Sequence, residues 1–196
     1  MGLLVLIRNA LGAALDAVLA VSRWIGILAV AFMVSAILIQ VFYRYILNNA
    51  LPWPDEAARF GMLWMTGLMA PIAFRSGGFV AIETLPDLLP KRSGDVLNLL
   101  LLSISLVVLI VAVSLGYKEV TGFGGRFATA SLYLPTSLTF DEWYRIPRSW
   151  MMLSLFVGII LLIAVNIELM LRSLIGLMGG NDGMSEQEET PAGGAE

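Results

Sequence analysis

The sequence predicts an all-α membrane protein with four transmembrane helices, an N-terminal amphipathic helix and short interfacial helices. Of its 196 residues, 58% are hydrophobic and only 14% are charged, whereas a soluble domain carries about 25% charged residues. The charges also leave long gaps, and about 20 apolar residues suffice for a helix to cross a membrane. The uncharged gaps are residues 24–43, 60–74, 96–117 and 149–167.

Residues 1–23 form the first expected element. On a helical wheel their polar side chains fall on one narrow stripe, and leucine, isoleucine and valine cover the rest. This pattern predicts an amphipathic helix that either lies in the membrane interface or runs into the first span. A cleaved signal peptide is the alternative, but a basic start and a clear small-residue cleavage site are missing. The stripe consists of Arg8, Asn9, Gly12, Asp16 and Arg23.

The four expected spans follow, near residues 24–46, 55–75, 96–117 and 149–172. The second gap is short, but Arg59 can extend its side chain to the headgroups and lengthen the span. The segment Pro52–Glu56 reads as a helix start, because proline fits the first turn and acids face the positive end of the helix dipole. Glycines such as Gly67 and Gly158 are common in spanning helices, and the sequence alone gives them no particular role.

The connections and the tail complete the chain. Residues 75–95 alternate apolar and charged positions around two prolines, which favours short interfacial helices. Residues 118–148 form the longest loop and end in aromatic and basic residues that are typical of membrane-interface anchors. The Gly-rich, acidic segment 176–196 is expected to be disordered. The expected anchors are Trp143, Tyr144, Arg145, Arg148 and Trp150.

The composition also excludes classes of function. The chain has no His and no Cys, which excludes most zinc sites, bis-histidine haem ligation, iron–sulfur clusters and disulfides. Ser-His-Asp and Cys-His catalysis are excluded for the same reason. A net charge of −3 gives no basic field for nucleic acid. We therefore expect no nucleic-acid partner and none of these metal, haem or catalytic sites.

The tightest polar cluster brackets the first hairpin of spans. Arg44 lies near the end of span one, and Asp55, Glu56 and Arg59 lie in the first turns of span two. Two interpretations stay open: a set of interfacial charges that neutralise one another, or a docking site for a partner's membrane helices. Gln40 lies deeper in span one and favours a helix contact.

Spans one and three contain no acidic residue away from their ends, so a proton or substrate relay is not expected there. Glu168 and Arg172, spaced i, i+4, predict a salt bridge at the membrane interface where span four ends. The 12 basic residues divide equally between the two sides of the membrane, so they do not set the orientation.

The segment Gln40–Arg59 resembles a motif of the small membrane subunit of tripartite ATP-independent periplasmic (TRAP) transporters, the DctQ family. Its two halves match QxxxRYxxN at the end of span one and PWxEExxR at the start of span two, with Asp55 in place of the first acid. Residues 73–83 and 146–158 resemble two further segments of the family. The resemblance covers most of residues 24–172.

This resemblance implies a scaffold subunit in the bacterial inner membrane, with both termini in the cytoplasm, no enzymatic activity and no cofactor. It implies a large membrane subunit that carries the sodium and substrate sites, and a periplasmic binding protein that delivers an organic acid anion. A haem-free membrane anchor of a respiratory complex and a small stand-alone exporter are the alternatives. The expected partner-interface residues are Gln40, Arg44, Trp53, Asp55, Glu56, Arg59 and Arg75.

Overall fold

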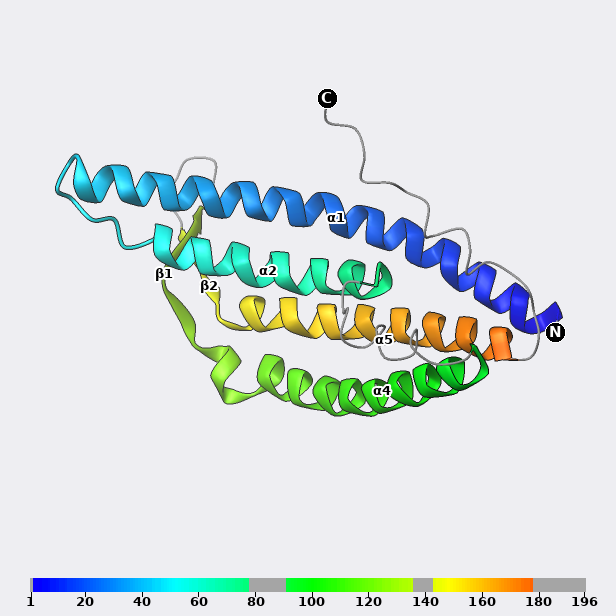
Figure 1. Ribbon diagram of the computed structural model, residues 1–196. Coiled ribbons are helices and arrows are strands. Elements are labelled where there is room, and N and C mark those ends of the chain that lie inside the picture. Colours follow the sequence, from blue (N-terminus) through cyan, green and yellow to red (C-terminus); the bar gives the residue numbers. More distant parts are fainter. Residues whose placement is uncertain (1, 78–90, 136–142, 178–196) are drawn as a thin grey trace, which may run out of the picture.

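The computed structural model describes residues 2–77, 91–135 and 143–177 (Figure 1). Each of its four long helices is long and apolar enough to cross a membrane, which confirms the all-α membrane class. The elements are α1 (Gly2–Tyr45), α2 (Pro54–Arg75), α4 (Lys91–Thr121), a 3₁₀ helix (Phe123–Arg126), β1 (Ala128–Pro135), β2 (Trp143–Pro147) and α5 (Ser149–Leu177).

Helix α1 contains 44 residues and continues through residue 23 without a break. No proline interrupts it, and at 1.5 Å per residue it is about 66 Å long, roughly twice the hydrocarbon thickness. Of the two arrangements that the sequence leaves open, the structure therefore shows the N-terminal segment running into the first span.

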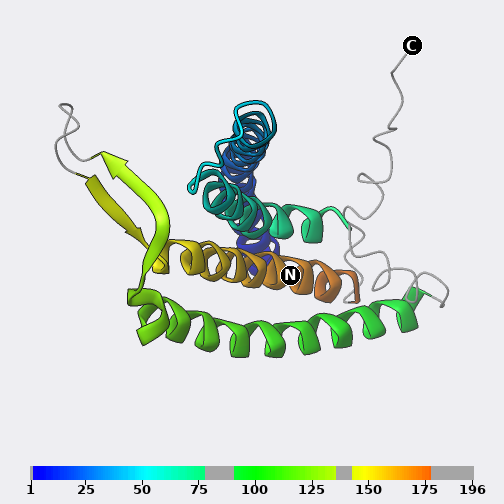
Figure 2. The ribbon, with the colours of Figure 1, turned by 90° about the vertical axis from the view of Figure 1, so that its left-hand side faces the viewer.

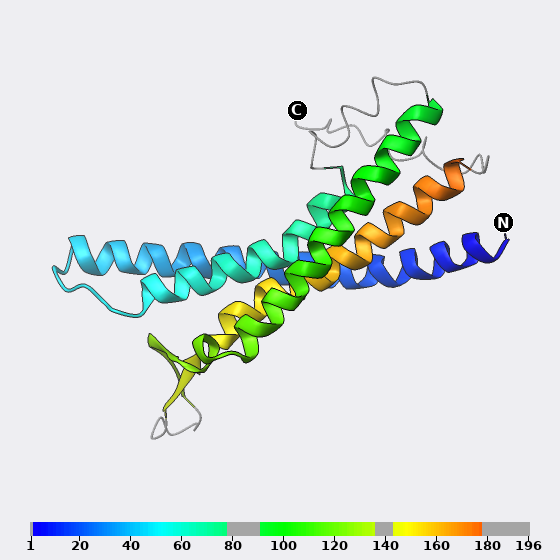
Figure 3. The same ribbon diagram turned by 90° about the horizontal axis from the view of Figure 1, so that it is seen from below.

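The four helices form two antiparallel pairs, α1 with α2 and α4 with α5 (Figures 1 and 2). Figure 3 shows that the two pairs cross at a clear angle, with α2 and α5 in contact at the centre. These central helices bury about a third of their spanning residues, whereas α4 buries 6%. Most of the side-chain surface of α4 is therefore available to lipid or to another protein.

Small residues let α2 and α5 touch at their crossing. A Cβ atom on Gly158 would lie 2.5 Å from the carbonyl oxygen of Gly67, and one on Gly67 would collide with the carbonyl of Ser154. Helices in membranes associate through such close backbone approaches, because lipid offers no hydrophobic driving force between them. These two glycines, to which the sequence alone gives no role, thus allow the close approach of the two pairs.

A two-stranded antiparallel sheet, β1 with β2, occupies part of the expected loop 118–148. Tyr133 pairs with Arg145 and Ala128 with Pro147, with an irregularity in the register between them. Figure 2 shows this hairpin projecting at one end of the helices. It is an addition to the fold that the sequence analysis did not predict.

Two expectations fall largely outside the described residues. The interfacial helices expected between residues 75 and 95 coincide mostly with residues 78–90, and the expected disordered tail coincides with residues 178–196. At the edges of these segments the structure adds detail. Helix α4 begins at Lys91, earlier than the expected span, and α5 continues to Leu177, just inside the expected tail.

Candidate functional site

An ion cluster joins three helices at the end of the bundle where α2 stops. Arg75, the last residue of α2, forms ion pairs with Asp16 of α1 and with Glu168 of α5. Its Nε atom lies 2.8 Å from Glu168 Oε2, and its Nη2 atom donates to Glu168 Oε1 over 2.9 Å. Arg172 adds a second cation 2.5 Å from Glu168 Oε1. The cluster therefore ties α1, α2 and α5 together at one level.

The structure confirms the Glu168–Arg172 pair and adds that its acid is buried. The Glu168 side chain is only 1% exposed, so the carboxylate lies inside the bundle, and its depth in the membrane stays a prediction. A buried carboxylate is costly unless it is paired and hydrogen-bonded, and here two guanidiniums neutralise it. Sequence reasoning missed this because Arg75 lies 93 positions from Glu168 along the chain.

The opposite end of α2 holds the hairpin in place through Glu56. Its carboxylate accepts hydrogen bonds from the backbone N–H of Ala130 (2.8 Å) and Ser131 (2.6 Å). The Ser131 hydroxyl lies 2.6 Å from the same carboxylate and 2.8 Å from the Pro52 carbonyl oxygen. Arg145 of β2 donates to the Ala130 carbonyl over 2.7 Å. Glu56 thus fastens β1 to the first turn of α2.

The four charges of the predicted polar cluster do not pair with one another within the described part of the chain. Asp55 accepts a long hydrogen bond of 3.4 Å from the Gln40 side chain, and Glu56 bonds to the hairpin. Arg44 lies over the ring of its neighbour Tyr45, 5.9 Å from the ring centre. Mutual neutralisation is therefore not what this part of the structure shows.

Arg59 differs from the other members of that cluster. It is exposed and makes no ion pair or hydrogen bond among the residues that the structure describes. Trp53, which directly precedes α2, is also partly exposed. By contrast, the Arg75 side chain is 14% exposed and held inside the ion cluster. That these residues contact a partner stays a prediction.

The expected anchors lie at the hairpin end of the bundle. Trp143 and Tyr144 on β2 and Trp150 in the first turn of α5 are exposed. Arg145 lies over the ring of Tyr133, 5.4 Å from its centre. The backbone carbonyl oxygen of Arg148 accepts a hydrogen bond of 3.0 Å from the N–H of Met151, in the first turn of α5. Their depth in the membrane stays a prediction.

Comparison with known proteins places the chain in a family. The family model described as "Tripartite ATP-independent periplasmic transporters, DctQ component" matches residues 33–176. The chain belongs to this family. As a DctQ component it is a multi-pass membrane protein and the small membrane subunit of a TRAP transporter.

A relative with sequence similarity is the isethionate TRAP transporter permease protein DctMQ of Oleidesulfovibrio alaskensis. It is 33% identical over 73 residues, which cover 34% of this chain and 11% of the relative. The DctQ chain therefore spans about a tenth of that relative's length. No solved structure matches the chain.

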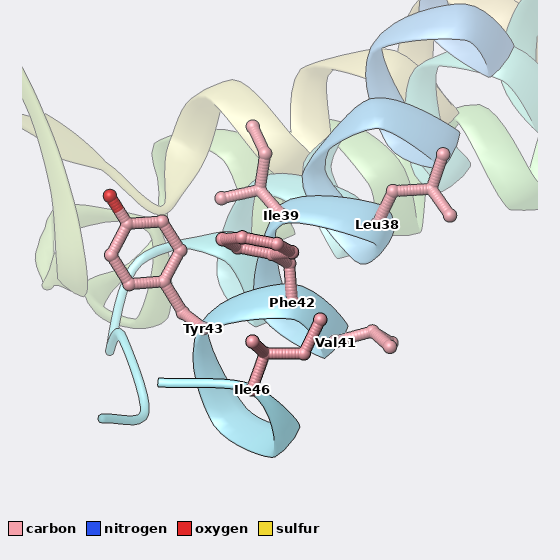
Figure 4. Close-up of a pocket in the computed structure, with 6 residues that line it drawn as sticks. All are labelled: Leu38, Ile39, Val41, Phe42, Tyr43 and Ile46. Carbon is pink, nitrogen blue, oxygen red and sulfur yellow. The ribbon is translucent and has the colours of Figure 1, made fainter. Parts of the chain in front are cut away.

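The DctQ motif of residues 40–59 coincides with the end of the molecule that carries the hairpin. Overlapping the first part of this motif, the last turns of α1 and the residue that follows them form an open apolar hollow of about 500 Å³ (Figure 4). The Tyr43 hydroxyl is the only polar side-chain group among its lining residues. The hollow therefore suits contact with apolar groups and not with a charged solute. It is lined by Leu38, Ile39, Val41, Phe42, Tyr43 and Ile46.

The acidic side chains of the described residues do not cluster in the way that a metal site requires. The described residues contain no group of three or more His, Cys, Asp or Glu side chains that could hold a metal ion. Two acidic side chains, those of Asp16 and Glu168, form ion pairs with Arg75.

Proposed function

We propose that this DctQ component is the immobile scaffold of a sodium-coupled transporter that takes up an organic acid anion. A large membrane subunit carries the sodium and substrate sites in this proposal, and this chain performs no enzymatic step. The observation that carries the proposal is the state of Glu168. This buried carboxylate is held by Arg75 and Arg172, so its oxygens already bind two guanidiniums and are not open to a sodium ion or a solute.

The distribution of apolar surface supports a scaffold role. Helix α4 exposes a long row of aliphatic side chains, and its spanning part buries only 6% of its residues inside the chain. Such a surface needs lipid or another membrane helix against it. The exposed row includes Val96, Leu100, Ile104, Val107, Val111 and Leu115.

The class of solute comes from the relative and not from a site in this chain. That relative is named for isethionate, a small sulfonate anion. A small organic anion is accordingly the solute that we propose for the present transporter. Its recognition falls to the large subunit and to a periplasmic binding protein.

The proposed orientation places both termini in the cytoplasm and the hairpin in the periplasm. The exposed cations Arg44 and Arg59, with the hairpin held by Glu56, then face the side from which a binding protein arrives. Exposed charges on a docking surface mainly set the rate and specificity of association. We therefore propose this end of the molecule as a docking surface for both partners: the large subunit, which Arg59 contacts, and the binding protein.

Reconstituted transport tests the scaffold role. Proteoliposomes are prepared with the large subunit, with or without this chain, and uptake of labelled carboxylates and sulfonates is followed with the binding protein and an inward sodium gradient. We expect uptake only when both membrane subunits and sodium are present. Full uptake without this chain would overturn the scaffold role, and uptake that is independent of sodium would overturn the coupling.

The absence of cysteine makes the orientation testable with single-cysteine variants. In intact cells, a membrane-impermeant maleimide should label Asn49→Cys, after α1, and should spare Asn9→Cys, near the N-terminus. The reverse pattern would invert the proposed topology.

A further inference from the structure

A polar cavity of about 380 Å³ lies where α1, the end of α2 and α5 come together. Three helices each contribute one arginine to its lining: Arg23 from α1, Arg75 from α2 and Arg172 from α5. Figure 1 shows that α2 lies between α1 and α5. Arg23 and Arg172 therefore reach the cavity from the two helices on either side of α2, and Arg75 reaches it from α2 itself.

Among the described residues, the charges around this cavity do not balance. Three guanidiniums and the Asp16 carboxylate line it. Asp16 and Glu168, a carboxylate just outside the lining, are both bound to Arg75. Glu168 also binds Arg172. Arg23 makes no ion pair or hydrogen bond among the described residues and so leaves one positive charge in excess. The cavity thus has the charge to accept a single anion.

The position of the cavity indicates where that anion comes from. Helix α2 contains 22 residues and is about 33 Å long, close to the hydrocarbon thickness of about 30 Å. Its last residue, Arg75, therefore marks the level of the lipid headgroups. The lining also contains Ser76 and the apolar side chains of Leu19, Ala20 and Ile72. A polar cavity with an apolar floor at this level matches a lipid with a charged headgroup and acyl chains.

We propose that this cavity binds the phosphodiester of an anionic membrane phospholipid, with Arg23 as the main ligand. Basic pockets between membrane helices are a recurring way to recognise such headgroups. A lipid with one net negative charge, such as phosphatidylglycerol, balances the excess charge. A zwitterionic lipid would bring an additional cation to a site that already has a surplus. The proposal does not depend on the transported solute or on sodium.

Native mass spectrometry of the full chain in detergent tests this site. Phosphatidylglycerol and phosphatidylcholine with identical acyl chains are titrated onto the wild type and onto Arg23→Gln, Arg23→Lys and Arg8→Gln. Arg8 is the matched control, because it lies on the same helix but outside the cavity lining. One arginine near a membrane surface contributes about 1 kcal/mol to anionic-lipid binding, which is about a five-fold change in affinity.

We expect phosphatidylglycerol to bind more tightly than phosphatidylcholine, and Arg23→Gln to weaken it about five-fold. Arg23→Lys and Arg8→Gln should retain affinity within about two-fold. Equal loss in Arg8→Gln and Arg23→Gln would show only non-specific attraction and would overturn the proposal. Displacement of the lipid by millimolar inorganic phosphate would overturn the lipid as the ligand in favour of a free anion.

A second variant tests the cavity while the Arg23 charge stays in place. Ala20→Trp fills the cavity from α1 and removes no charged group, and thermal unfolding in detergent verifies that each variant is folded. Loss of phosphatidylglycerol binding by folded Ala20→Trp supports the cavity as the site. Unchanged binding by this variant would contradict it.

Discussion

Arg75 closes helix α2 by pairing with Glu168, a carboxylate that is 93 positions away in sequence and almost fully buried in α5. Because α2 and α5 belong to different antiparallel pairs, this contact links the two halves of the bundle. Asp16 on one side and Arg172 on the other extend the link. Because both side chains are largely buried, either charge would destabilise the folded chain if it lacked its partner.

Replacing Glu168 with leucine should destabilise the chain by about 3–5 kcal/mol, because Arg75 would be left partly buried without its main counter-charge. Unfolding in detergent, followed by circular dichroism, measures the change. The double variant Glu168→Leu/Arg75→Leu should recover part of the loss, since it removes both charges. Glu119→Leu, an exposed position near the end of α4, is the control. A stability of Glu168→Leu equal to that of the control would contradict the role of the pair.

Substitution of Gly67 by alanine should disturb the crossing of α2 and α5. The new methyl group would collide with the Ser154 carbonyl, and overpacking of this kind typically costs about 1–3 kcal/mol. Gly176→Ala is the matched control, because a Cβ at Gly176 has nothing within 4 Å. Thermal unfolding compares the two. If both variants melt at the same temperature, the close approach at Gly67 is not a determinant of stability.

Removal of the Glu56 carboxylate should release the hairpin from α2. Glu56→Ala deletes the acceptor of two backbone N–H groups, those of Ala130 and Ser131, and a hydrogen bond to a charged group contributes about 1.5–3 kcal/mol. Hydrogen–deuterium exchange over β1 should therefore accelerate by at least about ten-fold. Asp55→Ala, whose carboxylate bonds to Gln40, should leave β1 unchanged. Equal exchange rates of β1 in the two variants would show that Glu56 does not hold the hairpin against α2.

Charge reversal at Arg59 should weaken assembly with the large subunit. This side chain is exposed and makes no ion pair within the described residues, so Arg59→Glu changes the surface without breaking an internal contact. Like charges brought together at an interface cost several kcal/mol, and recovery in co-purification should fall at least about ten-fold. Arg126→Glu, exposed in the 3₁₀ helix, should co-purify normally. Unchanged recovery of Arg59→Glu, at equal expression, would count against docking at this site.

The sequence by itself determined the class, the number of spans and the family motif. Membrane-spanning helices satisfy their backbone hydrogen bonds within each segment, so apolar length and charge spacing suffice to locate them. The sequence also predicted the start of α2 at Pro54 and its acidic first turn, because helix-start signals lie within a few neighbouring residues. The motif of residues 40–59 pointed to the DctQ family, which the family match confirms.

Only the tertiary structure decided which helix faces which. Helices that are apolar on most of their surface carry little periodicity to mark a buried face, so the meeting of Gly67 with Gly158 could not be read from spacing. The β1–β2 hairpin was missed because an isolated two-stranded sheet is marginal in stability, and here Glu56 of a distant helix supports it. The pairing of Glu168 with Arg75 is decided in the same way, because long-range packing brings a buried acid and a base together.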